Sequence, residues 1–173
     1  MKKSLIIFCI FLLTACGWHL RGSDPKLSSQ LQWTDIAISA DDEHTAFFTY
    51  LRPALDTYHL KESESATNQL QIQNLELDRR TAGVGADALT SAYELTLSVE
   101  YRLGSDQQSS EKFTRASVTR TYNYNLNNAN GAAQEEALIL REMHRELAQQ
   151  ILRRTRLLLS QRSDNKDHGQ TSP

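Results

Sequence analysis

The sequence contains no cysteine after position 16. Its two cysteines, Cys9 and Cys16, both lie near the N-terminus. The rest of the chain therefore has no thiol for a disulfide or for a thiolate metal site. Small secreted folds often depend on disulfides, so we expect this one to be held together by its hydrophobic core alone.

The sequence also lacks an excess of positive charge. It has 19 Lys and Arg residues against 21 Asp and Glu residues, a formal net charge of -2. Because a nucleic-acid binder needs a basic surface to neutralise phosphates, no nucleic-acid partner is expected. The hydrophobic content of 39% and charged content of 23% are ordinary for a globular protein, and 173 residues have room for a single domain.

Only one long apolar run is present, from Leu5 to Leu13, directly after a basic start with Lys2 and Lys3. A helix that spans a membrane needs about 20 apolar residues, so this run is too short to be a permanent anchor. A basic start followed by a short apolar run is typical of a signal peptide, which we place at residues 1–15.

Small residues precede Cys16 in the tetrad Leu13-Thr14-Ala15-Cys16, which resembles a lipobox. The resemblance implies cleavage between Ala15 and Cys16, a diacylglyceryl group on the Cys16 thiol and acylation of its new amine. The alternative is an ordinary signal peptide with an accidental cysteine. Each long acyl chain contributes on the order of 10 kcal/mol to anchoring, so two or more are effectively permanent. By analogy with enteric bacteria, Gly17 in place of Asp directs the lipoprotein to the outer membrane.

The mature chain divides into a tether and one periplasmic domain. Residues 16–32 carry the lipid and a stretch with little periodicity, and residues 33–160 hold the periodic segments. Beyond Gln161 the composition is polar, which predicts a disordered tail over 161–173. Cleavage removes Lys2 and Lys3, so the mature chain is more acidic, and its attachment must come from the lipid and a protein partner.

Hydrophobic periodicity predicts four strands and two helices. Residues 33–39 alternate as a strand, and an acidic start at residues 41–43 precedes a helix in which Pro53 predicts a kink or an early stop. The apolar face of that helix is formed by Phe47, Phe48, Leu51, Leu55 and Tyr58.

Three successive strands follow. Residues 70–77 change phase between Ile72 and Leu75, which predicts a bulge, and a turn with Gly83, Gly85 and Asp87 comes next. Residues 93–103 alternate most clearly, and residues 113–124 are rich in Thr, Val and Tyr. A long helix over 132–160 completes the series. The apolar stripe of this helix consists of Leu140, Met143, Leu147, Ala148, Ile151, Leu152 and Leu158.

The predicted order is strand, helix, strand, strand, strand, helix. The expected fold is α/β of the α+β kind, with two helices packed on one face of a four-stranded mixed sheet.

Catalytic and metal-binding patterns are missing. No two of the five histidines have the spacing of a zinc helix motif, and no serine lies in a Gly-x-Ser-x-Gly elbow. We therefore expect no enzyme, no metal and no cofactor other than the covalent lipid on Cys16.

The residues from Cys16 to Gly22, Cys-Gly-Trp-His-Leu-Arg-Gly, are similar to the mature start of the LptE family of lipopolysaccharide-assembly lipoproteins. Thr81–Val84 before Ala92-Tyr93, and Arg141–Met143 in the last helix, are similar too. The resemblance implies an outer-membrane lipoprotein facing the periplasm. Such a protein forms a plug in the LptD β-barrel, assists assembly of that barrel, binds lipopolysaccharide and helps to deliver it to the cell surface.

One departure from the family concerns the ligand. In relatives, basic residues at the sheet tip and near the start of the last helix are thought to meet lipid A phosphates, but residues 83–89 and 131–133 contain none here. The nearest cations, Arg79 and Arg80, are either a substitute contact or a solvated strand end. Trp18, His19, Leu20 and Arg21 form either a segment that docks on a partner or the bilayer, or part of the tether.

Two other interpretations stay open. The chain could be an outer-membrane lipoprotein accessory to another barrel-assembly or secretion machine. A periplasmic hydrolase or sugar-binding lipoprotein would need clustered acid and base side chains or an aromatic-lined cleft.

Overall fold

The computed structural model describes residues 32–86, 88–105 and 112–169. The chain divides into two units, Met1–Gln32 and Trp33–Pro173, and the second is described here. Predictions on the signal peptide, Ala15, Cys16, the segment Trp18–Arg21 and most of the tether therefore lie outside the described residues.

The sheet has five strands, where the sequence predicted four. They are β1 (Thr34–Ala40), β2 (Leu60–Glu62), β3 (Asn68–Val84), β4 (Thr90–Ser105) and β5 (Thr114–Asn123), in the order β2-β1-β3-β4-β5. β1 runs parallel to β2 and to β3, and β3, β4 and β5 are antiparallel neighbours. The sequence missed β2 because three residues are too short to show alternation.

β4 provides the clearest division between a buried and a polar face. Leu95, Leu97, Val99, Tyr101 and Leu103 are all buried, with exposed fractions of 6% or less. The residues between them turn to the opposite face, as a strand's period of two requires. The predicted alternation over 93–103 is therefore confirmed.

β3 contains the predicted bulge. Its register with β4 shifts between Gln73 and Glu76, and Asn74 takes a left-handed φ of 54°. Asn tolerates this conformation better than most residues, and the Asn74 side-chain amide donates to Glu100 over 2.9 Å. Gly83, predicted in the turn, instead belongs to β3, and the turn itself is Gly85–Leu89, where Gly85 N–H donates to the Leu89 carbonyl over 2.8 Å.

α3 (Ala46–Ala54) ends early, as Pro53 predicted. The chain continues in a single 3-10 turn, η2 (Asp56–Tyr58), and His59 follows in the left-handed region with a φ of 54°. Leu55, predicted on the apolar face of this helix, lies beyond its end but is still buried in the core.

α4 (Ala129–Gly169) is longer than predicted at both ends. A 3-10 turn, η3 (Leu126–Asn128), precedes it, and the Asn128 side-chain oxygen accepts from Gly131 N–H over 3.2 Å, so Asn128 caps the helix. The tail expected from residue 161 onward is helical as far as Gly169. Arg162 contributes by donating to the Leu103 carbonyl over 2.9 Å, which holds this part of the helix against β4.

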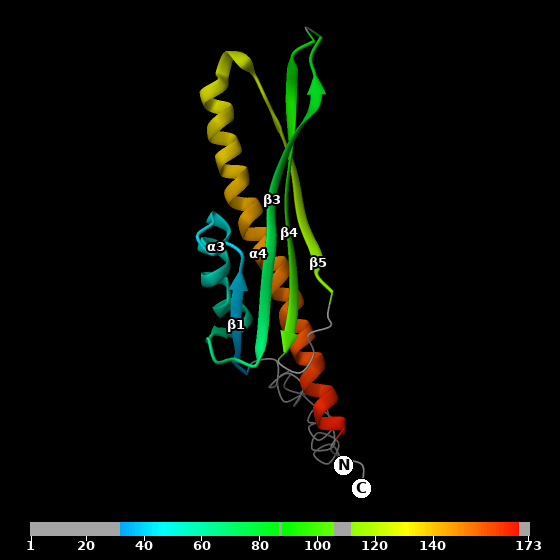
Figure 1. Ribbon diagram of the computed structural model, residues 1–173. Helices are drawn as coiled ribbons and strands as arrows, with labels where there is room; N and C mark the ends of the chain where they lie inside the picture. Colours follow the sequence, from blue (N-terminus) through cyan, green and yellow to red (C-terminus); the bar gives the residue numbers. More distant parts are fainter. Residues whose placement is uncertain (1–31, 87, 106–111, 170–173) are drawn as a thin grey trace, which may run out of the picture. The chain divides into compact units, whose positions relative to one another are not determined.

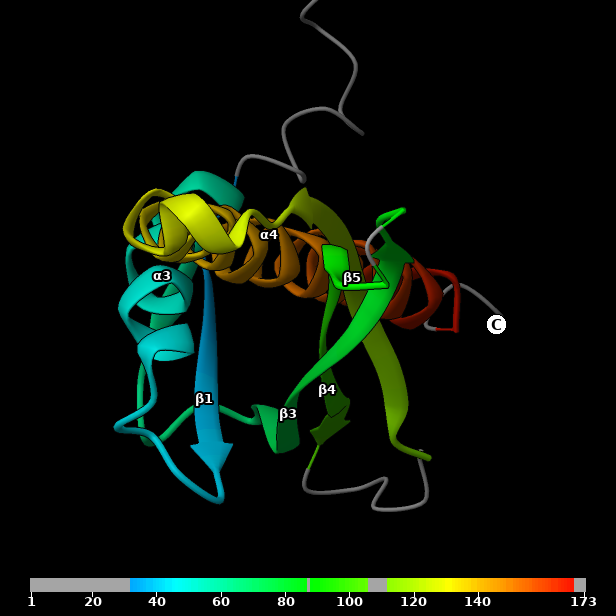
Figure 2. The ribbon, with the colours of Figure 1, turned by 90° about the horizontal axis from the view of Figure 1, so that it is seen from above.

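Both helices cover the same face of the sheet, as the sequence predicted (Figures 1 and 2). α4 packs against β4, β5 and α3. Met143, Leu147, Ala148, Ile151 and Leu152 of its predicted stripe are fully buried. None of the described helices is long and apolar enough to cross a membrane.

The core makes a stability prediction about α4. We expect Leu147→Ala to lower the free energy of unfolding by about 2–5 kcal/mol, because Leu147 is 0% exposed and its removal leaves a cavity. Leu138→Ala is the matched control, since Leu138 lies on the same helix but is 53% exposed. Urea denaturation of both variants measures the difference, and equal losses would contradict the observed packing.

Candidate ligand-contact site

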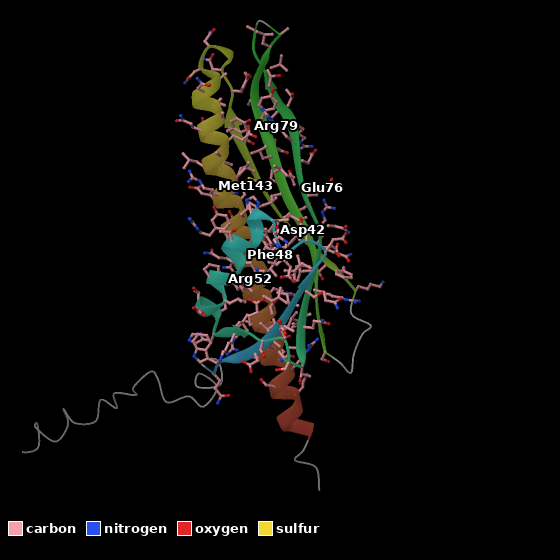
Figure 3. All side chains as sticks on the ribbon, turned by 60° about the vertical axis from the view of Figure 1, so that its left-hand side comes forward. Asp42, Phe48, Arg52, Glu76, Arg79 and Met143 are labelled. Atoms are coloured by element: carbon pink, nitrogen blue, oxygen red, sulfur yellow. The ribbon has the colours of Figure 1, made fainter. Side chains whose placement is uncertain are left out.

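The two cations predicted as ligand contacts are neighbours on β3 but lie on opposite faces of the sheet. Arg79 is opposite Leu95 in register, on the helix-covered face, and Arg80 is opposite Glu94, on the polar face. Figure 3 shows Arg79 farther toward the β3–β4 hairpin than Glu76 and Met143. The sheet therefore does not bring these two arginines together into one site, because adjacent residues of a strand point in opposite directions.

Arg79 belongs to a cluster formed by Arg79, Tyr93, Tyr122 and Glu136, which we call the tyrosine cluster. The Arg79 guanidinium carbon lies 3.9 Å from the centroid of the Tyr93 ring, a cation–π distance. Its Nη1 lies 3.5 Å from a carboxylate oxygen of Glu136. The Tyr122 hydroxyl donates to that same carboxylate oxygen. The cluster thus connects β3, β4 and β5 to the early turns of α4.

The electrostatics of the cluster centre on Tyr122, which is 2% exposed. Burial and the hydrogen bond to the Glu136 carboxylate both raise the pKa of Tyr122 well above its usual range. Arg79 opposes this shift because its positive charge favours a tyrosinate. The hydroxyl therefore stays protonated and donates to Glu136 throughout the physiological range.

Arg80 makes a simpler contact across the strands. Its Nε donates to a carboxylate oxygen of Glu94 over 2.7 Å. The Arg80 side chain is 69% exposed, so water screens this ion pair and it contributes little to stability. An anionic ligand could reach Arg80 from solvent, in competition with Glu94.

A third arginine, Arg120, lies near Arg79 in the sheet and was not predicted from the sequence. Leu95 of β4 pairs with Arg79 of β3 on one side and with Arg120 of β5 on the other. The Arg120 side chain donates to Glu146 of α4. The linear sequence separates Arg79 and Arg120 by about 40 residues. Only the strand register shows that both arginines flank Leu95 in the sheet.

Two apolar side chains are exposed in the described part of the hairpin end. Val84 is 64% exposed and Leu89 is 50% exposed, on either side of the Gly85–Leu89 turn. Ala132, in the first turn of α4, is 8% exposed. Neither residues 83–89 nor residues 131–133 contain a Lys or an Arg.

No cluster of metal-ligating side chains occurs in the part of the chain that the structure describes. It contains no group of three His, Cys, Asp or Glu side chains that could hold a metal ion. His144 packs instead on the Tyr50 ring, with centroids 5.9 Å apart, and its Nδ1 lies 2.7 Å from the Leu140 carbonyl oxygen.

Comparison with known families decides the classification. The model of the LptE family, described as lipopolysaccharide-assembly, matches residues 33–155, which include all five strands, α3 and most of α4. The chain belongs to the LptE family. An LPS-assembly lipoprotein LptE from Pectobacterium atrosepticum is 27% identical over 158 residues, which cover 87% of this chain and 83% of the relative.

Solved structures show the same LptE fold. Rare lipoprotein B from Shewanella oneidensis superposes with a TM-score of 0.65 at 20% identity, covering 77% of this chain and 99% of that one. Lipoprotein B from Nitrosomonas europaea also gives 0.65, at 22% identity, covering 83% of this chain and 93% of that one. The predicted α+β fold is thus confirmed, with one more strand.

The tyrosine cluster predicts a pH-dependent stability. Because the pKa of Tyr122 is raised in the folded state, its stabilising contribution is complete below the unfolded pKa of about 10 and is lost as the pH rises above that value. Tyr122→Phe should lower the free energy of unfolding by about 1–2 kcal/mol at pH 7, since it removes a hydrogen bond to a carboxylate. The difference in the free energy of unfolding between the wild-type chain and Tyr122→Phe should become smaller at pH 10.5–11. Urea denaturation of both proteins at pH 7 and at pH 10.5–11 measures this difference. An equal difference at the two pH values would contradict the raised pKa of Tyr122 in the folded state.

Proposed function

We propose that this LptE-family chain is a non-enzymatic lipoprotein of the outer membrane that forms a plug in the LptD β-barrel and assists its assembly. In this proposal the chain is cleaved after Ala15, lipidated on Cys16 and faces the periplasm. It also binds lipopolysaccharide and takes part in its delivery to the cell surface. The observation that carries the proposal is the family match, which extends over the whole described sheet, α3 and most of α4.

The uncovered face of the sheet supports a position inside a barrel. The lumen of an outer-membrane barrel is polar, so a plug needs a surface that tolerates water and polar side chains. This face satisfies that need through hydrogen bonds between neighbouring strands: Arg102 to Gln71 at 2.6 Å, Gln73 to Glu100 at 3.0 Å, Arg115 to Ser98 at 2.7 Å and Arg80 to Glu94 at 2.7 Å.

Arg79 and Arg80 are the proposed contacts for lipid A phosphates. A guanidinium carries five N–H donors, and among the described residues each of these arginines forms an ion pair with one carboxylate, Glu136 for Arg79 and Glu94 for Arg80. A phosphate brings more negative charge than one carboxylate, so it can compete for either arginine. The segment Trp18–Arg21 is proposed to contact the barrel or the bilayer beside the lipid.

Depletion of the protein in its own cell tests the function. We expect loss of mature LptD on non-reducing gels and stalling of lipopolysaccharide before it reaches the surface. A plasmid copy of the wild-type chain should restore both, whereas a Cys16→Ser copy should restore them poorly because it lacks the anchor. Normal surface lipopolysaccharide after depletion would overturn the plug proposal.

Substitution of the two arginines tests the ligand contact separately. We expect Arg79→Ala with Arg80→Ala to weaken lipopolysaccharide binding in a pull-down by about tenfold or more, because two charge-assisted contacts are lost. Arg115→Ala is the matched control, since it removes one exposed, ion-paired arginine from the same sheet. Unchanged binding in the double variant would show that the phosphates are held elsewhere.

A further inference from the structure

The charges of α4 are divided between its two halves. The half from Ala129 to Glu146 contains four glutamates and two arginines. The half from Leu147 to Gly169 contains five basic residues, Arg153, Arg154, Arg156, Arg162 and Lys166, against two acidic residues, Asp164 and Asp167, which lie in its last turns.

The helix dipole does not account for this basic half. A dipole favours cations in the last turn of a helix, and its effect falls off beyond that turn. Because α4 continues to Gly169, Arg153, Arg154 and Arg156 lie more than three turns before its end. Their clustering therefore needs another explanation.

The structure places Arg156 at the end of the sheet where β1 begins, and Arg153 and Arg154 lie within one turn of Arg156 on α4. Arg156 Nη1 donates to the Thr34 hydroxyl over 2.8 Å, and Thr34 N–H donates to the His59 carbonyl over 3.0 Å. In Figure 1 the start of β1 and the orange part of α4 lie at the same end of the domain, away from the β3–β4 hairpin. We call Trp33, Arg153, Arg154 and Leu157 the basic end.

The basic end also exposes apolar side chains. Trp33 is 58% exposed, with its ring edge-on to His59 at a centroid distance of 5.5 Å. Leu157, between the arginines and the end of α4, is 50% exposed. Trp is favoured where one side of a ring meets hydrocarbon and the other meets water, as at the surface of a bilayer.

The tether limits how far this end can move from a membrane. Trp33 follows Cys16 by 17 residues, which can span at most about 61 Å at about 3.6 Å per residue. The 16-residue strand β4 is about 54 Å long at about 3.4 Å per residue. A lipid on Cys16 therefore limits the distance of the start of β1 from the bilayer, and the hairpin end can lie farther away by up to the length of β4.

We propose that the basic end is a docking surface for an anionic phospholipid bilayer. Arg153 and Arg154 meet the headgroup phosphates, and Trp33 and Leu157 enter the interface beside them. The proposal rests on lipidation at Cys16 for the proximity of the membrane, but it does not require LptD or lipopolysaccharide. It assigns a membrane orientation to a domain whose net charge alone would not attract it to such a surface.

Carboxylates near the start of the strands weaken the attraction without cancelling it. Asp35 faces Lys61 across the β1–β2 pair, so those two charges offset one another. Asp56 and Glu64 are exposed but belong to η2 and to the connection after β2, not to α4. A short tether raises the local concentration of the surface, so weak attraction is sufficient for docking.

The natural attachment point allows a direct test. Cys16 is the only thiol of the mature chain, so residues 16–173 can be coupled through it to a maleimide phospholipid in vesicles. Trp18→Phe leaves Trp33 as the only tryptophan. The core cluster of the described residues lies between Ile36 and Leu159, so neither change touches it. The readouts are Trp33 emission and its quenching by brominated acyl chains, in phosphatidylcholine vesicles with and without phosphatidylglycerol.

We expect a blue shift of Trp33 emission and quenching in the vesicles that contain phosphatidylglycerol, both reversed at high salt. Arg153→Ala with Arg154→Ala should lower the ratio of docked to undocked protein by about 25-fold, from about fivefold for each arginine at an anionic surface. Arg141→Ala with Arg145→Ala is the matched control, because it removes the same charge from the acidic half of α4.

Three results would overturn the proposal. They are Trp33 emission that is the same with and without anionic vesicles, quenching that is equal in neutral vesicles, and equal effects of the two arginine pairs. Because the vesicles contain neither LptD nor lipopolysaccharide, failure here leaves the plug proposal intact. Normal lipopolysaccharide transport after depletion would likewise leave this membrane contact standing.

Discussion

The burial of one face of β4 under α4 is the interaction on which the rest of the structure depends. The row from Leu95 to Leu103 packs against the row from Met143 to Leu159, and both rows lie within the same continuous core. Burial of an aliphatic side chain contributes about 1.5–3 kcal/mol, so these two rows dominate the stability of a domain without disulfides. They also determine which parts of α4 meet the hairpin end and which meet the start of β1.

The register of that packing gives the two halves of α4 different surroundings. The acidic half lies beside Arg79 and Arg120, which contact Glu136 and Glu146 respectively. The basic half meets hydroxyl and carbonyl oxygens, through Arg156 to Thr34 and Arg162 to Leu103. One end of the helix thus has its charges balanced by the sheet, and the other presents exposed arginines at the point where the tether enters.

The departure from the family at the hairpin has a physical consequence. Residues 83–89 contain no Lys or Arg, the apolar Val84 and Leu89 are exposed there, and the nearest cations, Arg79 and Arg80, lie on two faces of β3. Arg79 and Arg80 already contact Glu136 and Glu94, so an anion that binds either arginine must compete with a carboxylate. The shared fold does not by itself transfer the ligand contacts of the family.

Local patterns in the sequence determined much of this protein: the strand alternation over 93–103, the bulge after Ile72, the early end of α3 at Pro53 and the apolar stripe of α4. Each of these follows from side-chain periodicity or from the backbone chemistry of a single residue, which act within a few positions. The tertiary structure alone decided β2, the continuation of α4 to Gly169 and the separate partners of Arg79 and Arg80. Those features depend on contacts between residues far apart in the chain: β2 forms because Leu60 is buried beside β1, and Arg162 is held by a carbonyl of β4. No periodic pattern records such contacts, because they arise only when the sheet and helix have come together.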